Sequence, residues 1–580
     1  MRTSRILPVF SLLAAQATSR SQQVPLSLSQ PRDRIVDAEL YTRIEDKFRA
    51  LNVAGASLAI VWSEESRPVE YTTWGKRDED GTSVTSDTIF NIASCSKAFL
   101  SASLGILMQD FADGKNTTLR DLLPEEWLLE DEWATEKADL RDLLSHRTGL
   151  PAHDLSYSPY DSPADVVTKV RHLRAANELR AQYEYTNLMY IVGAHIIFKY
   201  SGLDYRDFVA KRIFKPLGMS SSTLYPDEAA ATGRLSQAWS PVSGRRIRFF
   251  MPEHSALLIA GAGGVQSTVQ DMSYWIRTVL NRGVDPRTNE TIIPKSTFEL
   301  ATSAISVLSE TGNPFASIMG YGMGWIRFSY RGHDSLSHSG GAPGVGTRVE
   351  VYPDDGFGIV LLTNTAAQEG SRAIPPMIVD RVLGLASIYE QPEPMSPIRL
   401  ATTNADLALE RRSLEHLVGT YTNPGYGNFT LCSPLFSKRK ACKAVVEDFA
   451  TVDGPDHLPM HLVSLYAEWG RVWGTHLRLT PMSLEGASAE AYKVEVTTLY
   501  PRGYGKDSSP FEDPGDELVA RLAFADDKDG EEGRVLGLGL FGVAQGESAK
   551  LRARKGGSTI REMADVWFEK VTDGHYGDEL

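Results

Sequence analysis

Hydrophobic and polar positions along the first 390 residues predict a mixture of helices and strands. Apolar residues from Phe99 to Met108 recur at helical spacing, which predicts an amphipathic helix. Apolar runs at 57–62 and 71–74 are expected to form a hairpin, and runs at 347–352 and 358–363 are expected to be strands around a Pro-Asp-Asp-Gly turn. Strands at both ends with helices between them are typical of an α+β domain with one antiparallel sheet.

A different pattern follows a proline-rich segment near residue 390. Residues 476–479 and 492–496 alternate between apolar and polar side chains, as half-buried strands do. Residues 534–543 are more continuously apolar, and residues 566–568 are expected to close the same sheet. This part is therefore predicted to be an all-β barrel or sandwich, and no catalytic cluster stands out in it.

The chain is predicted to divide at the proline-rich segment. Its 580 residues exceed what one hydrophobic core usually serves, and three prolines stand between Pro392 and Pro397. Proline disfavours helix and removes backbone donors, so an extended linker is expected there. The predicted units are a signal peptide at 1–19, a catalytic domain at 35–388, a linker at 389–410 and a C-terminal β-barrel domain at 411–580.

The first residues are typical of a signal peptide. Arg2 and Arg5 give a positive start, a short apolar run extends to Ala15, and small residues follow at the spacing that a signal peptidase needs. The alternatives are a buried first helix or a membrane anchor, but the run is too short to span a bilayer. A secreted protein, or one in the secretory pathway, is therefore expected.

Two further features fit a secretory route. Asn-x-Ser/Thr sequons at Asn116, Asn289 and Asn428 are candidate glycosylation sites. Cys432 and Cys442 are close enough in sequence to bridge a hairpin as a disulfide, or they are two ordinary thiols. Either way Cys95 has no obvious partner.

Charge and composition exclude several classes of function. The formal net charge of −14 repels phosphate backbones, so nucleic-acid binding is not expected. The histidines do not cluster at zinc spacing and no phosphate-binding glycine loop precedes a helix, so no metal and no organic cofactor is indicated. A small-molecule or peptide substrate is the expected partner, and the sequence leaves the oligomeric state open.

Ser94 and Lys97 form the first candidate for chemistry. If Ser94 opens a helix, Lys97 lies one turn further along the same face, within reach of the serine oxygen. Burial would lower the pKa of Lys97 enough for it to act as a base toward the serine. A bare S-x-x-K also arises by chance, but Lys97 would enter a helix that is otherwise rich in core residues, where an unpaired lysine is costly.

Two further motifs supply the remaining candidates. Tyr185 and Asn187 are two apart before a helix that begins near Leu188, and they can shuttle protons and hold a substrate carbonyl; alternatively Asn187 caps the helix and Tyr185 is core. His338-Ser339-Gly340-Gly341 can bring a strand edge close to a substrate and offer a backbone N–H to an oxyanion; alternatively it is a glycine-rich loop with a structural histidine.

In order, these three motifs resemble those of the serine β-lactamase and penicillin-binding-protein superfamily, in its class C and esterase branch. Further stretches also resemble that superfamily in their residues and in their order along the chain: residues 144–151, 262–265, 321–325 and 360–364. The likeness covers roughly residues 40 to 390 and implies a β-lactamase-like antiparallel sheet flanked by a helical region. The C-terminal part, from Leu417, looks more loosely like the lipocalin-like β domain often appended to such enzymes.

The resemblance implies a role for each motif residue. Ser94 would be the acylated nucleophile, Lys97 and Tyr185 would share proton transfer, and Asn187 would orient the lysine and the substrate. The backbone N–H groups of Ser94 and Gly341 would form the oxyanion hole. His338 would polarise a substrate group beside a binding edge made by Ser339 and Gly340, whereas His146 and Trp325 would be structural.

One departure from the family pattern narrows the expected chemistry. His338 stands where β-lactamases and penicillin-binding proteins carry a lysine, and a largely neutral imidazole holds a substrate carboxylate less well. The expectation is hydrolysis of an ester or amide through a Ser94 acyl-enzyme. Transfer of the same acyl group to an alcohol or amine, as in transesterases of secondary metabolism, is the alternative, and a non-catalytic binding protein of this fold is a third.

Overall fold

The structure is a computed structural model that describes residues 34–110, 117–366, 368–388, 414–482, 491–525, 533–544, 547–554 and 558–571. The predicted signal peptide at 1–19, the predicted linker at 389–410 and the candidate glycosylation site Asn116 lie outside the described residues. The domain boundaries therefore stay predictions.

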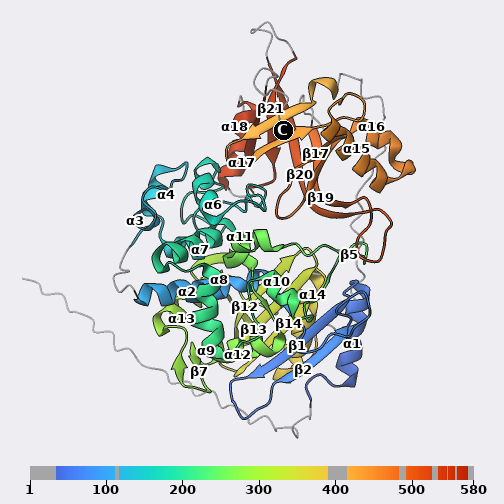
Figure 1. The fold of residues 1–580 in the computed structure, drawn as a ribbon. Coiled ribbons are helices and arrows are strands. Elements are labelled where there is room, and N and C mark those ends of the chain that lie inside the picture. Colours follow the sequence, from blue (N-terminus) through green and yellow to red (C-terminus); the bar gives the residue numbers. More distant parts are fainter. Residues whose placement is uncertain are drawn as a thin grey trace, which may run out of the picture.

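An eight-stranded antiparallel sheet forms the base of the N-terminal part (Figure 1). Its order is β2-β1-β14-β13-β12-β11-β10-β9, so the first and last strands of this part pair in the interior of the sheet. The expected hairpin and the expected strand pair are both confirmed, by the pairing of β1 with β2 and of β13 with β14. The strands are β1 (Gly55–Trp62), β2 (Glu70–Gly75), β9 (Ser306–Ser309), β10 (Met319–Tyr321), β11 (Ile326–Tyr330), β12 (His333–Ala342), β13 (Val345–Tyr352) and β14 (Phe357–Thr363).

Helices cover both faces of this sheet. Helices α1 (Ala38–Ala50) and α14 (Gln368–Leu383) pack on one face, where apolar side chains of β1 and β14 form one core. Helix α12 (Val269–Leu280) packs against β1 and β14 on the other face. Because both faces are covered, every residue of β1 is buried, and its sequence is correspondingly apolar.

A helical region is inserted in the chain between β2 and β9. Besides α12 it contains the long helices α2 (Lys97–Asp110), α7 (Leu188–Ser201) and α11 (Glu253–Gly263), and a 3-10 turn, η1 (Ala93–Ser96), precedes α2. The shorter elements are α3 (Leu119–Leu122), α4 (Glu132–Lys137), α5 (Leu140–Leu144), α6 (Pro163–Lys169), α8 (Tyr205–Val209), α9 (Lys215–Leu217), α10 (Pro226–Ala231) and α13 (Lys295–Ala301), with the small strand pairs β3 (Phe90–Asn91) and β6 (Gln266–Ser267), β4 (Ala238–Trp239) and β5 (Arg246–Ile247), and β7 (Val284–Asp285) and β8 (Glu290–Thr291).

The expectation that residues 99–108 form an amphipathic helix is wrong in one respect. The helix exists as α2, but its residues are buried almost all the way round, including Ser101 and Ser103. Helices α7, α11 and α13 all pack against it, so no side of α2 is left for solvent. A helix in the centre of a helical layer needs no polar face, and its hydrophobic pattern then has no preferred side.

The C-terminal part contains a second eight-stranded antiparallel sheet, in the order β16-β15-β22-β21-β20-β19-β18-β17. Backbone hydrogen bonds of 2.7 and 2.9 Å between Cys432 and Tyr466 join its two edges, so the sheet is nearly closed into a barrel. The expected barrel-like sheet is confirmed. Residues 566–568 belong to it, but they lie inside the sheet in β22, between β15 and β21, and the edges that meet are β16 and β17. The strands are β15 (Gly419–Asn423), β16 (Gly427–Leu431), β17 (Leu465–Glu468), β18 (His476–Met482), β19 (Ala491–Tyr500), β20 (Phe511–Phe524), β21 (Val535–Phe541) and β22 (Val566–Lys570).

This part is not purely β, which corrects the expectation of an all-β domain. Among the described residues of this part, four α-helices lie outside the sheet: α15 (Lys440–Asp453), α16 (Leu458–Val463), α17 (Glu547–Arg554) and α18 (Ile560–Met563). Cys432, at the end of β16, forms a disulfide with Cys442 in α15, with Cα atoms 5.3 Å apart. The spacing of the two cysteines had suggested a bridge across a hairpin. In the structure the disulfide instead joins a strand to a helix. Cys95 is buried and unpaired.

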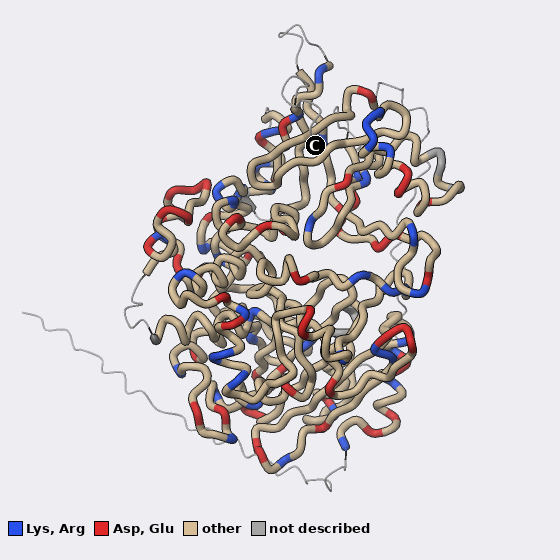
Figure 2. Tube along the Cα trace, viewed as in Figure 1, with Lys and Arg blue, Asp and Glu red and all other residues tan. Residues whose placement is uncertain are grey.

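The charged residues are spread over both parts of the molecule. Figure 2 shows Asp and Glu intermixed with Lys and Arg along both parts of the trace. Among the described residues, no helix is both long and apolar enough to cross a membrane.

Candidate active site

The turn that carries Ser94 is held in an uncommon backbone conformation. Ala93 has a φ of 44°, which an L-residue rarely adopts. The side chain of Asn91 stabilises this turn, because its Oδ1 accepts from the Ala93 N–H at 2.7 Å and its Nδ2 donates to the Gly263 carbonyl at 3.1 Å. The Ile92 N–H donates to the Val265 carbonyl at 2.9 Å. The residues after α11 thus fix the position of the candidate nucleophile.

Lys97 is wholly buried at the start of α2, and its amine lies beside Ser94. Its Nζ is 3.2 Å from Ser94 Oγ, 2.7 Å from Asn187 Oδ1 and 2.9 Å from the Ala262 carbonyl oxygen. Burial lowers the pKa of Lys97 to about 7, and the opposing charge of Asp154 only partly offsets this effect. A neutral amine has two N–H groups and one lone pair. The two carbonyl oxygens take the N–H groups, which leaves the lone pair for the Ser94 hydroxyl.

Tyr185 approaches the same serine from the other side. Its hydroxyl donates to Ser94 Oγ at 2.7 Å, and the Lys97 amine lies 4.7 Å from the centre of its ring. Burial raises the pKa of Tyr185, so the phenol is protonated in this arrangement. Tyr185 is placed to donate a proton.

Asn187 joins Lys97 to a carboxylate that the sequence motifs did not include. Its Nδ2 donates to both oxygens of Asp154, at 3.1 and 3.3 Å, while its Oδ1 accepts from Lys97. Asn187 stands at the N-cap position of α7, yet its side chain makes no capping hydrogen bond there. The alternative interpretation of Asn187 as a helix cap is therefore not the arrangement found.

A narrow pocket opens beside Ser94. Ser94, Asn187 and Gly341 of β12 are among the residues that line it, and Phe250 and Trp473 form an aromatic part of its wall. Those two rings stack with their centroids 5.6 Å apart. The free volume is about 20 Å³, room for one or two water molecules.

The β12 residues expected to bind substrate lie at this pocket. Gly340 packs against the nucleophile turn, because a Cβ there would come within 3.2 Å of the Ser94 backbone nitrogen. Ser339 and Gly341 are exposed, and a Cβ at Gly341 would meet no atom within 4 Å. The pairing of β11 with β12 ends at Ser337, so the next residues of β12 are paired with β13 alone.

His338 makes contacts that differ from its expected role. Its Nδ1 lies 2.6 Å from the Ser339 carbonyl oxygen, so this nitrogen donates, and Nε2 accepts from the Tyr321 hydroxyl at 3.0 Å. Burial lowers the pKa of His338 to about 3, so the ring is neutral. With both ring nitrogens engaged, the structure favours a structural role for His338 over the polarisation of a substrate.

His146 lies at the centre of a group of tyrosines. Its Nδ1 accepts from the Thr186 N–H at 3.2 Å, and burial lowers its pKa well below the usual value. Its ring packs within 5.5 Å of four tyrosine rings, Tyr183, Tyr185, Tyr190 and Tyr321. This packing fits the expected structural role of His146. Trp325 is also buried.

The structure brings Ser94, Lys97, Tyr185 and Asn187 together, but sequence reasoning missed two residues around them. Asp154 follows a stretch that resembles the family framework, and its position three residues after Pro151 was the only available signal. Nothing in the sequence pointed to Trp473, because it reaches the pocket from the C-terminal part. The candidate glycosylation sites Asn289 and Asn428 are exposed and distinct from this site.

The antiparallel sheet with its inserted helical region and the site around Ser94 can be compared with known proteins, and this comparison identifies the family. Residues 42–382 match the family described as Beta-lactamase, so the chain belongs to the β-lactamase family.

Several relatives are named as hydrolases. An unguisins hydrolase from Aspergillus campestris is 30% identical over 347 residues, which are 58% of this chain and 63% of that protein. A D-aminopeptidase from Brucella anthropi is 27% identical over 230 residues, 38% of this chain and 41% of that protein. The chain thus spans less than two thirds of the length of these relatives. They support an enzyme of the β-lactamase family.

One solved structure resembles most of the chain. The octameric penicillin-binding protein homologue from Pyrococcus abyssi matches with a TM-score of 0.53 and 19% sequence identity, over 87% of this chain and 97% of that chain. At this identity the likeness concerns the fold alone. The likeness of the C-terminal part to lipocalin-like domains stays a prediction.

Proposed function

We propose that this protein is a serine hydrolase that cleaves an ester or amide through an acyl-enzyme on Ser94. The observation that carries the proposal is the placement of Ser94 Oγ between a buried lysine amine at 3.2 Å and a tyrosine hydroxyl at 2.7 Å. A serine needs such a base before it can attack a carbonyl. The relatives named as hydrolases support the same class of reaction.

The geometry supports a division of proton transfers between two residues. Neutral Lys97 accepts the Ser94 proton as the serine oxygen bonds to the substrate carbonyl carbon. Tyr185 gives its proton to the leaving oxygen or nitrogen as that bond breaks, and Lys97 returns the first proton to Tyr185. Water then attacks the acyl group by the reverse sequence, which restores Ser94. The N–H groups of Ser94 and Gly341 would stabilise the oxyanion in both steps.

The substrate class is proposed from this chain's own chemistry and from its relatives. His338 is neutral and both its nitrogens are engaged, so it offers no positive charge to a substrate carboxylate. This favours neutral esters and peptide-like amides over β-lactam antibiotics. The name of one relative, a D-aminopeptidase, supports amide hydrolysis in particular.

The test is acylation and turnover of a 4-nitrophenyl ester, with and without an added alcohol or amine. Wild type should release nitrophenol and carry the acyl group on Ser94, as detected by mass spectrometry after acid quenching. Ser94→Ala should do neither. Ser103→Ala is the control, because Ser103 is a buried serine of the helix that follows the Ser94 turn and its hydroxyl has no partner among the described residues.

Each outcome of this experiment has a definite meaning. Equal turnover by Ser94→Ala would contradict the nucleophile assignment. An acylated Ser94 that releases its acyl group only when an acceptor is present would favour transfer over hydrolysis. Absence of both acylation and turnover with a series of esters and D- and L-amino-acid amides would favour a non-catalytic binding protein.

The same proposal includes a secretory location. The Cys432–Cys442 disulfide fits an oxidising compartment, and exposed Asn289 and Asn428 are accessible for glycosylation. Protein secreted from a eukaryotic host should lose mass on treatment with peptide N-glycosidase. Retention of an unmodified protein in the cytosol of that host would contradict this part of the proposal.

A further inference from the structure

A short segment of the N-terminal part, residues 153–157, lies between the Ser94 site and the barrel. Its side chains contact both the residues around Ser94 and the residues of the C-terminal part. His153 Nε2 donates to the Arg174 carbonyl at 2.8 Å, and its Nδ1 accepts from the Tyr426 hydroxyl of the C-terminal part at 2.6 Å. His153 also has a φ of 44°, so its backbone is held in a conformation that a free loop would seldom adopt.

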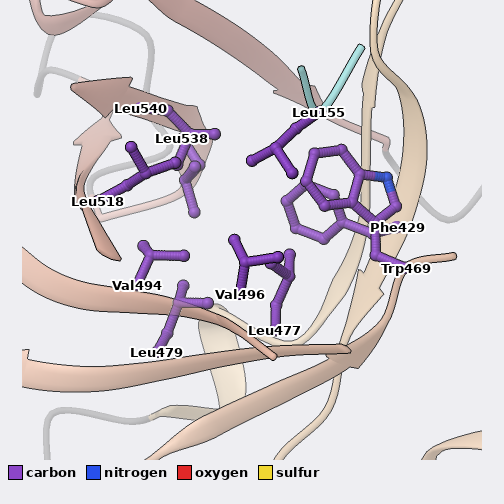
Figure 3. Close-up of a pocket in the computed structure, with 10 residues that line it drawn as sticks. All are labelled: Leu155, Phe429, Trp469, Leu477, Leu479, Val494, Val496, Leu518, Leu538 and Leu540. Atoms are coloured by element: carbon purple, nitrogen blue, oxygen red, sulfur yellow. The ribbon is translucent and has the colours of Figure 1, made fainter. Parts of the chain in front are cut away.

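Leu155 anchors this segment inside the barrel. Figure 3 shows its side chain among the apolar residues that line the barrel interior, where Leu477, Leu538 and Leu540 are among its neighbours. Nearly all of the Leu155 side chain is buried. The barrel therefore fixes the position of the residue next to Asp154.

Tyr157 is the second link between the segment and the C-terminal part. Its hydroxyl donates to Asp154 Oδ1 at 2.6 Å and accepts from the Trp473 indole N–H at 2.9 Å. Trp473 thus lines the pocket with its ring and holds Tyr157 with its nitrogen.

Asp154 determines which way the Asn187 amide points. A carboxylate only accepts hydrogen bonds, so the Asn187 NH₂ group must face Asp154. The Asn187 oxygen then faces Lys97, whose amine it accepts from at 2.7 Å. With a side chain at 154 that can also donate, the amide is free to turn over, and Lys97 loses a partner that directs its lone pair toward Ser94.

We infer that Asp154 is a positioning residue for Lys97, and that the C-terminal part belongs to the catalytic machinery because Trp473 and Tyr157 hold Asp154 in place. The inference rests on the proposed function, since it concerns the base that activates Ser94. It assigns to the barrel a role in the rate of acylation, separate from any contact with substrate.

The inference predicts a change in the pH dependence of acylation as well as in its rate. The negative charge of Asp154 raises the pKa of Lys97 against the effect of burial. The other titratable groups that interact electrostatically with these two residues are Cys95, His146, His338, Tyr157, Tyr185, Tyr426 and Asp516. All of them remain in an Asp154→Asn variant. Loss of the Asp154 charge should therefore move the rising limb of the profile to lower pH, by roughly one pH unit.

The experiment measures the rate at which a fluorophosphonate probe modifies Ser94 in the full-length protein between pH 5 and 10. Asp154→Asn should lower the maximal rate about 10- to 100-fold and move the rising limb to lower pH. Tyr157→Phe and Trp473→Phe should lower the rate by smaller factors. Trp473→Phe keeps an aromatic ring over the pocket and removes the N–H donor, so its effect reports on the hydrogen bond.

Matched controls separate this inference from a general loss of packing. Tyr205→Phe removes a buried hydroxyl and Trp469→Phe removes a buried indole N–H, and neither group has a partner among the described residues. Both controls should label at the wild-type rate. Combining Tyr157→Phe with Asp154→Asn should be no worse than Asp154→Asn alone, because Tyr157 acts through Asp154.

The outcomes distinguish this inference from the proposed function. A wild-type rate and profile in Asp154→Asn, or fully additive effects in the double variant, would overturn the inference alone. Failure of the probe to modify Ser94 in wild type would overturn the proposed function and the inference with it. If circular dichroism shows that Asp154→Asn is unfolded, the inference is tested with Tyr157→Phe instead. A rate of Ser94 modification in Tyr157→Phe equal to that of wild type then overturns the inference.

Discussion

The molecule has two neighbouring buried interiors that are built in opposite ways. Around Ser94 the interior contains titratable side chains, among them Lys97, His146 and His338. The pocket inside the barrel is lined by leucine, valine, phenylalanine and tryptophan side chains (Figure 3). Burial of apolar groups stabilises a fold directly, whereas buried polar groups stabilise it only when every donor and acceptor has a partner. The first interior serves chemistry and the second serves stability.

The two interiors meet at adjacent residues of one segment. Asp154 contacts the polar network, and Leu155 enters the barrel. Both residues lie in a turn that is closed by a hydrogen bond of 2.8 Å from the Ser156 N–H to the His153 carbonyl, so one short stretch sends side chains to both interiors. Four variants or conditions test how separate the two interiors are.

Lys97→Met should have the largest effect on activity. Proton transfer by a positioned base is typically worth about 10²–10⁴-fold in rate, so Ser94 acylation should fall by that factor. The free energy of unfolding should change by less than about 1 kcal/mol, because removing a buried amine offsets the loss of its hydrogen bonds. Stopped-flow acylation and urea unfolding measure the two quantities. A large loss of stability with little loss of rate would mean that the interior around Ser94 serves stability and not chemistry, which would contradict the comparison.

Leu155→Ala should have the opposite signature. Truncation of a buried leucine leaves a cavity and typically costs about 2–5 kcal/mol, so urea unfolding of the C-terminal part should shift accordingly. Fluorophosphonate labelling of Ser94 should fall by less than it does in Lys97→Met. An unchanged unfolding midpoint would show that Leu155 does not contribute to the barrel core.

Removal of the disulfide should destabilise the barrel and leave the Ser94 site largely intact. The bridge spans ten residues of chain, and a loop of this size is worth about 2–3 kcal/mol in the chain-entropy treatment. The variant is Cys432→Ser with Cys442→Ser, assayed by thermal unfolding and ester turnover. A reducing agent should reproduce the effect in wild type and have none in the variant. A loss of turnover larger than the loss of stability would contradict this prediction.

A change of pH should have the smallest effect on activity. Below about pH 7 the rate of acylation should change about tenfold per pH unit. Lys97 has a pKa of about 7 and accepts a proton only when it is neutral. Acylation should therefore rise with pH up to about 7 and level off above it, since Tyr185 stays protonated. The measurement is kcat/KM for a nitrophenyl ester between pH 5 and 9. A rate that falls as pH rises toward 7 would exclude Lys97 as the base.

Much of the fold followed from local patterns. Period-two alternation and turn residues placed the hairpin of β1 and β2 and strands β13, β14, β18 and β19, because strand pairing in an antiparallel sheet is largely local in sequence. The sequence pattern located helix α2 but did not predict its burial on nearly all sides. Whether a helix is buried or amphipathic depends on which other elements pack against it. The four helices of the C-terminal part were not anticipated.

The sequence by itself determined the candidate nucleophile and its neighbours. Ser94 and Lys97 lie one helical turn apart, so their contact is a property of local spacing. Tyr185 and Asn187 stand in a motif before α7, and the order of the motifs identified the family that was later matched.

Only the tertiary structure decided how that site is held and lined. Trp473 lies 316 residues from Tyr157, yet the two share a hydrogen bond, and the same indole lines the pocket beside Ser94. No periodicity or motif records such a contact, because it depends on how the barrel docks against the N-terminal part. The protonation states of Lys97 and Tyr185 likewise follow from burial, which exists only once both layers are packed around them.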